Sequence, residues 1–300
     1  MPAPKPVVAV APKPTCLAPA TWRVPLLWRI DGGKQRAYLL GTMHVSDLRV
    51  QTFPPSLAAA FDEATALYTE ISFDPANLSS IAGRVMLPPE QSLDKLLKPE
   101  VVARLQAFLS GRGLAWPMVL RMKPWVVMAM LTDKSALPTK AGATAASGPP
   151  APMSPPLDLL LSQRAQARKL TVAGLETVAE QVDAIETMSA AEQIAMLEAQ
   201  LTAAEATTTK PSAVAQLKDA FFCGDLEPLA RLIVKESAGL NAKLFQALFT
   251  TRNQRLAERM AQHLASDDHI TVYAIGAGHL TGTDGVVARL GRAGFHLTRQ

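Results

Sequence analysis

Two segments near opposite ends of this 300-residue chain repeat one pattern, an apolar strand followed by Gly-x-x-His. Residues 37–44 read AYLLGTMH and residues 272–279 read VYAIGAGH, with tyrosine at matching positions. Glycine at a strand exit permits a sharp turn or a close approach of the backbone to a ligand. Ligands of α/β sheets bind at the carboxyl ends of strands. We therefore expect His44 and His279 to share one site, which requires both segments to enter one sheet. A lone Gly-x-x-His is too short to exclude a structural histidine, but two copies in equivalent contexts favour the shared site.

Two glutamates also stand at predicted strand ends. Glu70 closes the apolar run at residues 66–71, and Glu176 follows the run at residues 170–175. A charge at the exit of a buried strand is costly unless it is paired, hydrogen-bonded or bound to a metal. Two imidazoles with one or two carboxylates could hold a divalent cation and polarise a water, or act without metal as general acid and base. The alternatives are an exposed strand end for Glu70 and a helix N-terminal carboxylate for Glu176.

One arginine falls on an apolar helix face. In the helix predicted for residues 240–264, Arg252 lies in the middle of the face and Asn253 at its flank. The apolar members of that face are Leu244, Phe245, Leu248, Leu256 and Met260. A buried arginine needs a carboxylate partner. Arg252 therefore forms a structural ion pair, orients Glu70 or Glu176, or steadies an oxyanion.

The order of elements predicts one α/β unit. Strands are expected at both ends of the chain, with a long helical middle that includes nearly all of residues 177–265. Residues 1–21 are a Pro-rich leader, either disordered or the remnant of a signal sequence. Residues 22–300 form a single domain with a flexible Pro-rich loop near residues 137–156.

Composition excludes several classes of protein. Two cysteines cannot form a disulfide scaffold or a four-thiolate zinc site. The net charge of +4 comes from residues 1–40, so the body of the chain is nearly neutral and nucleic acid is not an expected partner. No apolar run approaches the roughly 20 residues of a transmembrane helix.

The ordered set of motifs resembles the TraB/PrgY/GumN family, whose eukaryotic relatives include the Tiki proteases, and most closely its bacterial GumN-like branch. The resemblance covers about residues 22–297. Its motifs are residues 39–45, Glu70, residues 122–125, residues 174–177 with Gln181, Gly224-Asp225 after Cys223, Arg252-Asn253 and residues 276–282. The chain departs from the family before Leu157-Asp158, where a Pro-rich stretch replaces a short Gly-Tyr-containing turn.

This resemblance implies a mixed central sheet flanked by many helices, similar to the erythromycin-esterase and ChaN-like fold. It implies a divalent metal ion, with Mn²⁺ or Co²⁺ suggested by the family and Zn²⁺ as a further candidate. The implied metal ligands are His44, Glu70 and His279. The implied catalytic residues are Glu70, Glu176, Arg252 and Asn253, and the backbone at Gly41, Gly276 and Gly278 would face the cofactor.

The predicted function is a metal-dependent, peptidase-like hydrolase that acts on a peptide or small molecule. The alternative is a non-catalytic protein of the same fold that binds a peptide or haem. The resemblance implies a periplasmic or secreted protein, with a cytoplasmic one as the alternative. In an oxidising compartment Cys16 and Cys223 could pair. Oligomeric state stays open.

Overall fold

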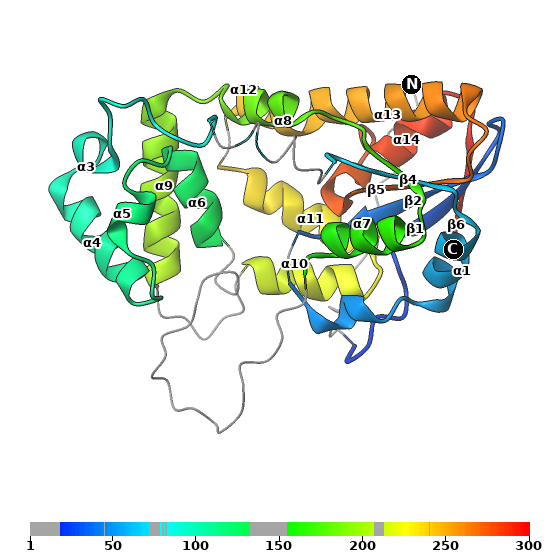
Figure 1. Cartoon of the computed structure of the whole chain (residues 1–300), viewed down its shortest axis with the longest axis horizontal. Coiled ribbons are helices and arrows are strands. Elements are labelled where there is room, and N and C mark those ends of the chain that lie inside the picture. Colours follow the sequence, from blue (N-terminus) through cyan, green and yellow to red (C-terminus); the bar gives the residue numbers. More distant parts are fainter. Residues whose placement is uncertain are drawn as a thin grey trace, which may run out of the picture.

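Six strands form one sheet in the order β4-β3-β5-β2-β1-β6 (Figure 1). The computed structural model describes residues 19–44, 46–72, 79, 81, 83–132, 155–206, 213–239 and 241–300. The strands are β1 (Leu27–Asp31), β2 (Ala37–Thr42), β3 (Ala66–Thr69), β4 (Thr171–Gly174), β5 (Thr271–Gly276) and β6 (His296–Arg299). β5 pairs in parallel with β2 and β3, whereas β1 pairs antiparallel with β2 and β6. The predicted single α/β domain with a mixed central sheet is confirmed.

The two segments that carry Gly-x-x-His lie side by side, because β2 and β5 are neighbours. Gly41 is opposite Ile275 and Thr42 is opposite Gly276, so the two strands are offset by one residue relative to the sequence repeat. β3 and β4 run in the same direction as β5, which places the carboxyl ends of all four parallel strands at one edge. The residues that follow β2, β3, β4 and β5 therefore come together at that edge.

Helices surround the sheet and extend beyond it (Figure 1). They are α1 (Pro55–Glu63), α3 (Leu93–Leu96), α4 (Pro99–Ser110), α5 (Trp116–Val119), α6 (Pro124–Thr132), α7 (Leu157–Ala167), α8 (Val178–Ile185), α9 (Ala190–Glu205), α10 (Ala213–Phe222), α11 (Leu226–Ser237), α12 (Ala242–Phe245), α13 (Thr251–Ser266) and α14 (Val286–Arg292). Short 3₁₀ turns occupy η1 (Leu48–Gln51) and η3 (Ala277–Leu280). Capping boxes start two of the helices predicted after Glu176, with Thr177 and Glu180 at α8 and Ser189 and Glu192 at α9.

One helix departs from the predicted regular spacing of residues 240–264. A π-helical turn, η2 (Gln246–Thr250), separates α12 from α13. A π turn holds more residues than an α turn, so it rotates the helix faces on its two sides relative to each other. As a result Phe245 is exposed, whereas Phe249 packs with its ring centroid 5.8 Å from that of His279. The predicted apolar face is therefore wrong at Phe245, whereas its neighbour Leu244 is buried as predicted.

Buried apolar side chains form two clusters. The larger one packs on both faces of the sheet and includes Leu39, Leu67, Tyr273 and Leu256. The second cluster joins α3, α4, α5, α6 and α9, and it is visible as the helical group on the left of Figure 1. Its side chains Leu87, Leu93, Leu97, Val101, Leu105, Phe108, Leu109, Val119, Val127, Leu131, Leu197, Leu201 and Ala204 pack on one another. The helical middle of the chain thus builds a core of its own beside the sheet.

Several sequence expectations fall outside the described residues. These include most of the leader at residues 1–21, the Pro-rich stretch up to residue 154, and Cys16. Cys223 is disulfide-bonded, and no cysteine in the described part of the chain is free. No helix within that part is long and apolar enough to cross a membrane.

Candidate functional site

The carboxyl ends of β2, β3 and β5 bring His44, Glu70 and His279 together. His44 Nε2 lies 4.0 Å from Glu70 Oε2, and His279 Nε2 lies 3.7 Å from Glu70 Oε1. Glu70 follows β3, which pairs with β5, and each of its two carboxylate oxygens lies near one imidazole. The sheet topology thus brings His279 next to two predicted site residues, His44 and Glu70, that precede it by more than 200 positions.

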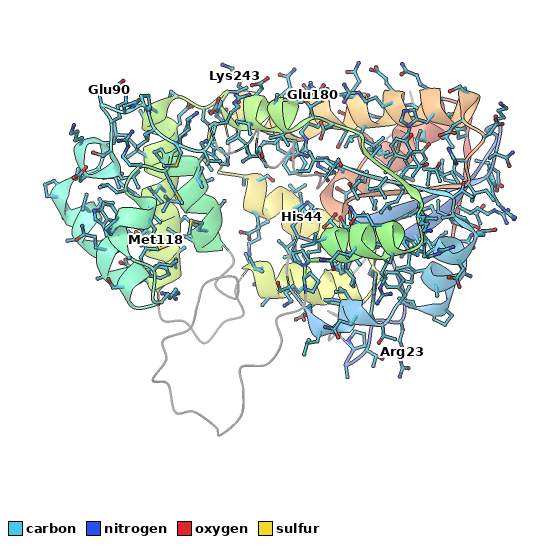
Figure 2. The ribbon with its side chains drawn as sticks, in the orientation of Figure 1. Arg23, His44, Glu90, Met118, Glu180 and Lys243 are labelled. Carbon is cyan, nitrogen blue, oxygen red and sulfur yellow. The ribbon has the colours of Figure 1, made fainter. Side chains whose placement is uncertain are left out.

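His44 is held by a carboxylate on α7. Its Nδ1 lies 2.8 Å from Asp158 Oδ2, while Asp158 Oδ1 accepts a hydrogen bond of 2.6 Å from Thr42 Oγ1. Asp158 stands in the first turn of α7 and is buried. Its negative charge raises the pKa of His44 to about 9, against the opposing effect of burial. The His44 side chain nevertheless remains 58% exposed, and Figure 2 shows it beside α7.

His279 is held differently, by an amide on α13. Its Nδ1 lies 2.7 Å from Asn253 Oδ1, and Asn253 Nδ2 donates to the backbone oxygen of Asp284 at 3.0 Å. Because the amide oxygen can only accept, Nδ1 of His279 carries the proton and Nε2 is left facing Glu70. The side chain is only 7% exposed, and this burial lowers the pKa of His279 to about 4.

Glu70 is a buried carboxylate surrounded by donors. Oε1 accepts 2.6 Å from the Gly276 amide, and Oε2 accepts 2.7 Å from Arg252 Nη2 and 3.1 Å from Gln181 Nε2. Burial alone raises the pKa of Glu70, but the charges of His279 and Arg252 and then of His44 outweigh it and lower the pKa to about 2. Glu70 is therefore ionised at neutral pH.

Arg252 connects Glu70 to Glu176, the second predicted glutamate. Glu176 Oε2 accepts 2.9 Å from Arg252 Nε and 2.7 Å from Nη2, and its Oε1 lies 3.3 Å from Arg255 Nη1. The Glu176 side chain has no exposed surface. Glu176 therefore anchors Arg252, which in turn holds Glu70. The carboxylate partner that the sequence predicts for a buried arginine is present twice.

The three predicted glycines lie in different surroundings. A Cβ added to Gly276 would stand 3.0 Å from Glu70 Oε1 and 3.7 Å from His44 Nε2, so this glycine allows the backbone to approach the site closely. A Cβ on Gly41 would meet Leu280 Cδ1 at 2.7 Å, inside the core. One on Gly278 would meet Phe249 at 3.5 Å. Of the three, only Gly276 is a position where an added Cβ would lie against both imidazoles and the carboxylate.

A cavity of about 240 Å³ opens beside these side chains. Its lining is His44, Thr69, Glu70, Ile71, Asp158 and Gln181. A larger hollow of about 540 Å³ lies between α1 and α7, away from the site, and none of its lining residues belongs to the imidazole and carboxylate cluster. The smaller cavity is therefore the one lined by site residues, and His44 rather than His279 contributes the imidazole.

The site contains residues to which sequence reasoning gave no role. Asp158, Gln181 and Thr42 all hydrogen-bond to predicted site residues. Thr42 and Gln181 stand within the family motifs, and Asp158 stands where the chain departs from them, but their spacing in the sequence carries no sign of their partners. Within the described ranges, no three His, Cys, Asp or Glu side chains are already arranged around a point at which a metal ion could sit.

Comparison with known proteins gives a consistent result across most of the chain. The model of the TraB/PrgY/gumN family matches residues 26–299. Metalloprotease TIKI1 of Danio rerio is 26% identical over 90% of this chain and 62% of its own length. Metalloprotease TIKI1 of Homo sapiens is 24% identical over 90% of this chain and 61% of its own length.

A bacterial relative matches with similar strength. An uncharacterised protein of Treponema pallidum is 24% identical over 87% of this chain and 78% of its own length. The chain thus spans about three fifths of the length of the metalloproteases that it matches. No solved structure gives a significant match.

Proposed function

The chain belongs to the TraB/PrgY/gumN family, and from this premise we propose that it is a metal-dependent hydrolase that cleaves peptide bonds. The observation that carries the proposal is the pair of imidazoles directed at one buried carboxylate, each with its Nδ1 already held by another side chain. The relatives named as metalloproteases support this choice of reaction.

The donor set fits a divalent cation. Histidine ligands bind through one ring nitrogen while the other is held by a carboxylate or an oxygen acceptor, as Asp158 and Asn253 hold His44 and His279 here. Two atoms bound to one ion at about 2.1 Å each stand at most about 4.2 Å apart. The histidine Nε2 atoms lie 3.7 and 4.0 Å from the Glu70 oxygens, just within this maximum. Binding would then draw the ligands closer together.

We assign His44, Glu70 and His279 as the residues that would hold the ion. Mn²⁺, Co²⁺ and Zn²⁺ all accept imidazole nitrogen together with carboxylate oxygen. When bound, such an ion polarises a carbonyl and lowers the pKa of a water molecule. The substrate would enter on the side of His44, because that imidazole is exposed to the cavity and His279 is not.

The remaining charges support this site in distinct ways. Arg252 directs its guanidinium at Glu70 and Glu176, so we assign it the orientation of those carboxylates rather than contact with an oxyanion. If one glutamate carries a proton during hydrolysis it is Glu70, because Glu70 lines the cavity and Glu176 does not. Asn253 would hold His279 in its ligating tautomer.

The test combines metal analysis with peptide turnover. Wild type purified without added metal or chelator, His44→Ala, Glu70→Gln and His279→Ala are compared by metal content and by cleavage of a peptide library with added Mn²⁺, Co²⁺ or Zn²⁺. Glu186→Gln is the control, because that carboxylate pairs with Lys123 and Arg84 outside the site. We expect one ion per chain and turnover in wild type and the control only. Absence of turnover with every ion, together with tight peptide or haem binding that survives both histidine substitutions, supports a binding protein instead.

We also propose that the protein works in the periplasm or outside the cell. The disulfide at Cys223 supports an oxidising compartment, since cytoplasmic thiols are kept reduced. We further propose a likeness to the erythromycin-esterase and ChaN-type fold, which a superposition on those proteins would test.

A further inference from the structure

The two imidazoles of the site are held by chemically different groups. His44 is held by the carboxylate of Asp158, whereas His279 is held by the neutral amide of Asn253. The two histidines also differ in exposure, since His44 opens to the cavity and His279 is enclosed. An exposed imidazole has room to rotate, so it needs a stronger hold than an enclosed one to keep one ring nitrogen directed at Glu70.

Asp158 has few structural partners for a buried charge. Its side chain is only 4% exposed, yet within the described part of the chain its one ion-pair partner is His44. Removing a carboxylate from water is costly even beside a charged partner, and an apolar side chain at such a position usually serves folding at least as well. Stability alone therefore does not account for a carboxylate here.

The carboxylate is itself fixed in place. Thr42 Oγ1 donates to Asp158 Oδ1 at 2.6 Å, which leaves Oδ2 directed at the imidazole. Thr42 is the last residue of β2 and Asp158 lies in the first turn of α7, so both stand on regular elements. The second oxygen of Asp158 therefore has a defined position, and the threonine that fixes it stands two residues before His44 in the chain.

An ionised carboxylate can only accept hydrogen bonds, so His44 must donate from Nδ1 across the 2.8 Å contact. In the neutral ring, Nε2 then keeps its lone pair and faces Glu70. We propose that Asp158 is a positioning residue, which with Thr42 sets the tautomer and orientation of the His44 ring. This inference rests on the proposed function, in which Nε2 of His44 binds the ion.

The test uses Asp158→Ala and Asp158→Asn, because the second variant removes the charge while keeping the volume. Thr42→Val frees one carboxylate oxygen, and Glu186→Gln serves as the control carboxylate. Long-range ¹H–¹⁵N NMR of the metal-free protein, at alkaline pH where His44 is neutral, reports its tautomer, with His44→Ala for assignment. Calorimetry with Zn²⁺ alone reports ion affinity, and steady-state kinetics separates kcat from KM.

We expect wild type and Glu186→Gln to show one His44 tautomer with a protected Nδ1 proton. Asp158→Ala and Asp158→Asn should show mixed or reversed tautomers and bind Zn²⁺ about 10- to 100-fold more weakly, and Thr42→Val should show a smaller loss. The loss should be in kcat rather than KM, because Asp158 acts through His44.

A His44 tautomer that stays fixed in both Asp158 variants overturns the inference, as does, when wild type binds Zn²⁺, an equal affinity in the Asp158 variants. If wild type binds no ion while the tautomer depends on Asp158, the positioning role stands and the proposed metal site falls. The two conclusions can therefore fail separately.

Discussion

Replacing Arg252 with methionine tests the charge arrangement of the site most directly. Arg252 Nη2 lies 2.7 Å from Glu70 Oε2 and 2.7 Å from Glu176 Oε2. One nitrogen therefore separates two buried carboxylates, whose side chains are 8% and 0% exposed. Methionine keeps much of the volume and removes the charge, so both carboxylates remain buried without their shared cation.

The expected loss follows from the spacing of the two carboxylates. Oxygens that share one donor nitrogen lie about 5 Å apart, and two unit charges at that distance repel by about 3 kcal/mol at an effective dielectric constant of about 20. Removing one partner of a buried ion pair costs about 3–5 kcal/mol in unfolding free energy, which agrees with this figure. Arg252→Met should therefore lower the Tm by roughly 10 °C.

The pKa of Glu70 determines how the stability difference between wild type and Arg252→Met changes with pH. The pKa of Glu70 in wild type, about 2, lies below its ordinary value of 4.5, so wild type loses stability as the pH falls below 4.5 toward 2. Without Arg252 the pKa of Glu70 loses one of the charges that lower it and should move up toward its ordinary value. The variant therefore loses less stability than wild type on acidification, and the difference in unfolding free energy between the two should narrow as the pH falls from 4.5 toward 2.

Urea unfolding of wild type, Arg252→Met and Arg255→Met at pH 7 and at pH 3 checks this reasoning. Arg255 is the matched control on the same helix, because its side chain is 28% exposed and its contact with Glu176, at 3.3 Å, is longer than that of Arg252. Removing its charge should therefore cost about 1 kcal/mol or less in unfolding free energy. A loss for Arg252→Met no larger than that of the control, or a difference that does not narrow at pH 3, refutes the argument.

Further expectations concern the glycines, the exposed histidine and the helical cluster. Gly276→Ala places a Cβ 3.0 Å from Glu70 Oε1, so peptide turnover should fall about 10-fold in steady-state assays with little change in Tm. Gly41→Ala overpacks the core against Leu280 and should cost about 1–3 kcal/mol by urea unfolding. The pKa of His44, about 9, lies above the ordinary 6.5, so its contact with Asp158 stabilises the metal-free protein below pH 6.5, and this contribution disappears as the pH rises through 9. The unfolding free energies of wild type and His44→Gln should thus differ by about 1 kcal/mol or less at pH 6 and converge by pH 10. Leu201→Ala opens a cavity in the second cluster and should cost about 2–5 kcal/mol, with turnover unchanged when measured well below the Tm.

The parts of this site that the sequence predicts are those that depend on local pattern. Short apolar runs ending in glycine or a charge are typical of buried parallel strands, and they place Glu70 and the two histidines at strand ends from the sequence alone. Arg252 is predictable for a similar reason, because a charge on an apolar helix face requires a partner. The identity of that partner, Glu70 and Glu176 together, depends on how α13 lies across the sheet edge.

Other features depend on packing that leaves no local trace. Asp158 stands in the first turn of a helix, where an acidic residue is ordinary, and only the position of α7 beside β2 gives it a role. The π turn before α13 is likewise invisible in residues 246–250, and it makes Phe249 rather than Phe245 the neighbour of His279. Sequence periodicity assumes a uniform helix, so it fails where the helix changes type.

The central position of β5 has a consequence for how the protein is made. β5 alone joins the pair β3–β4 to the group β2–β1–β6, since β2 and β3 have no pairing with each other. During synthesis the earlier strands leave the ribosome as two separate pieces with open edges, and residues 271–276 emerge more than 200 residues after β2. Such distant pairing is slow and exposes unpaired strands to association with other chains. The protein should therefore acquire its site in one late step. In nascent chains that end before β5, His44 and Glu70 stand on strands that are not yet joined in one sheet. Such chains should depend most on chaperones.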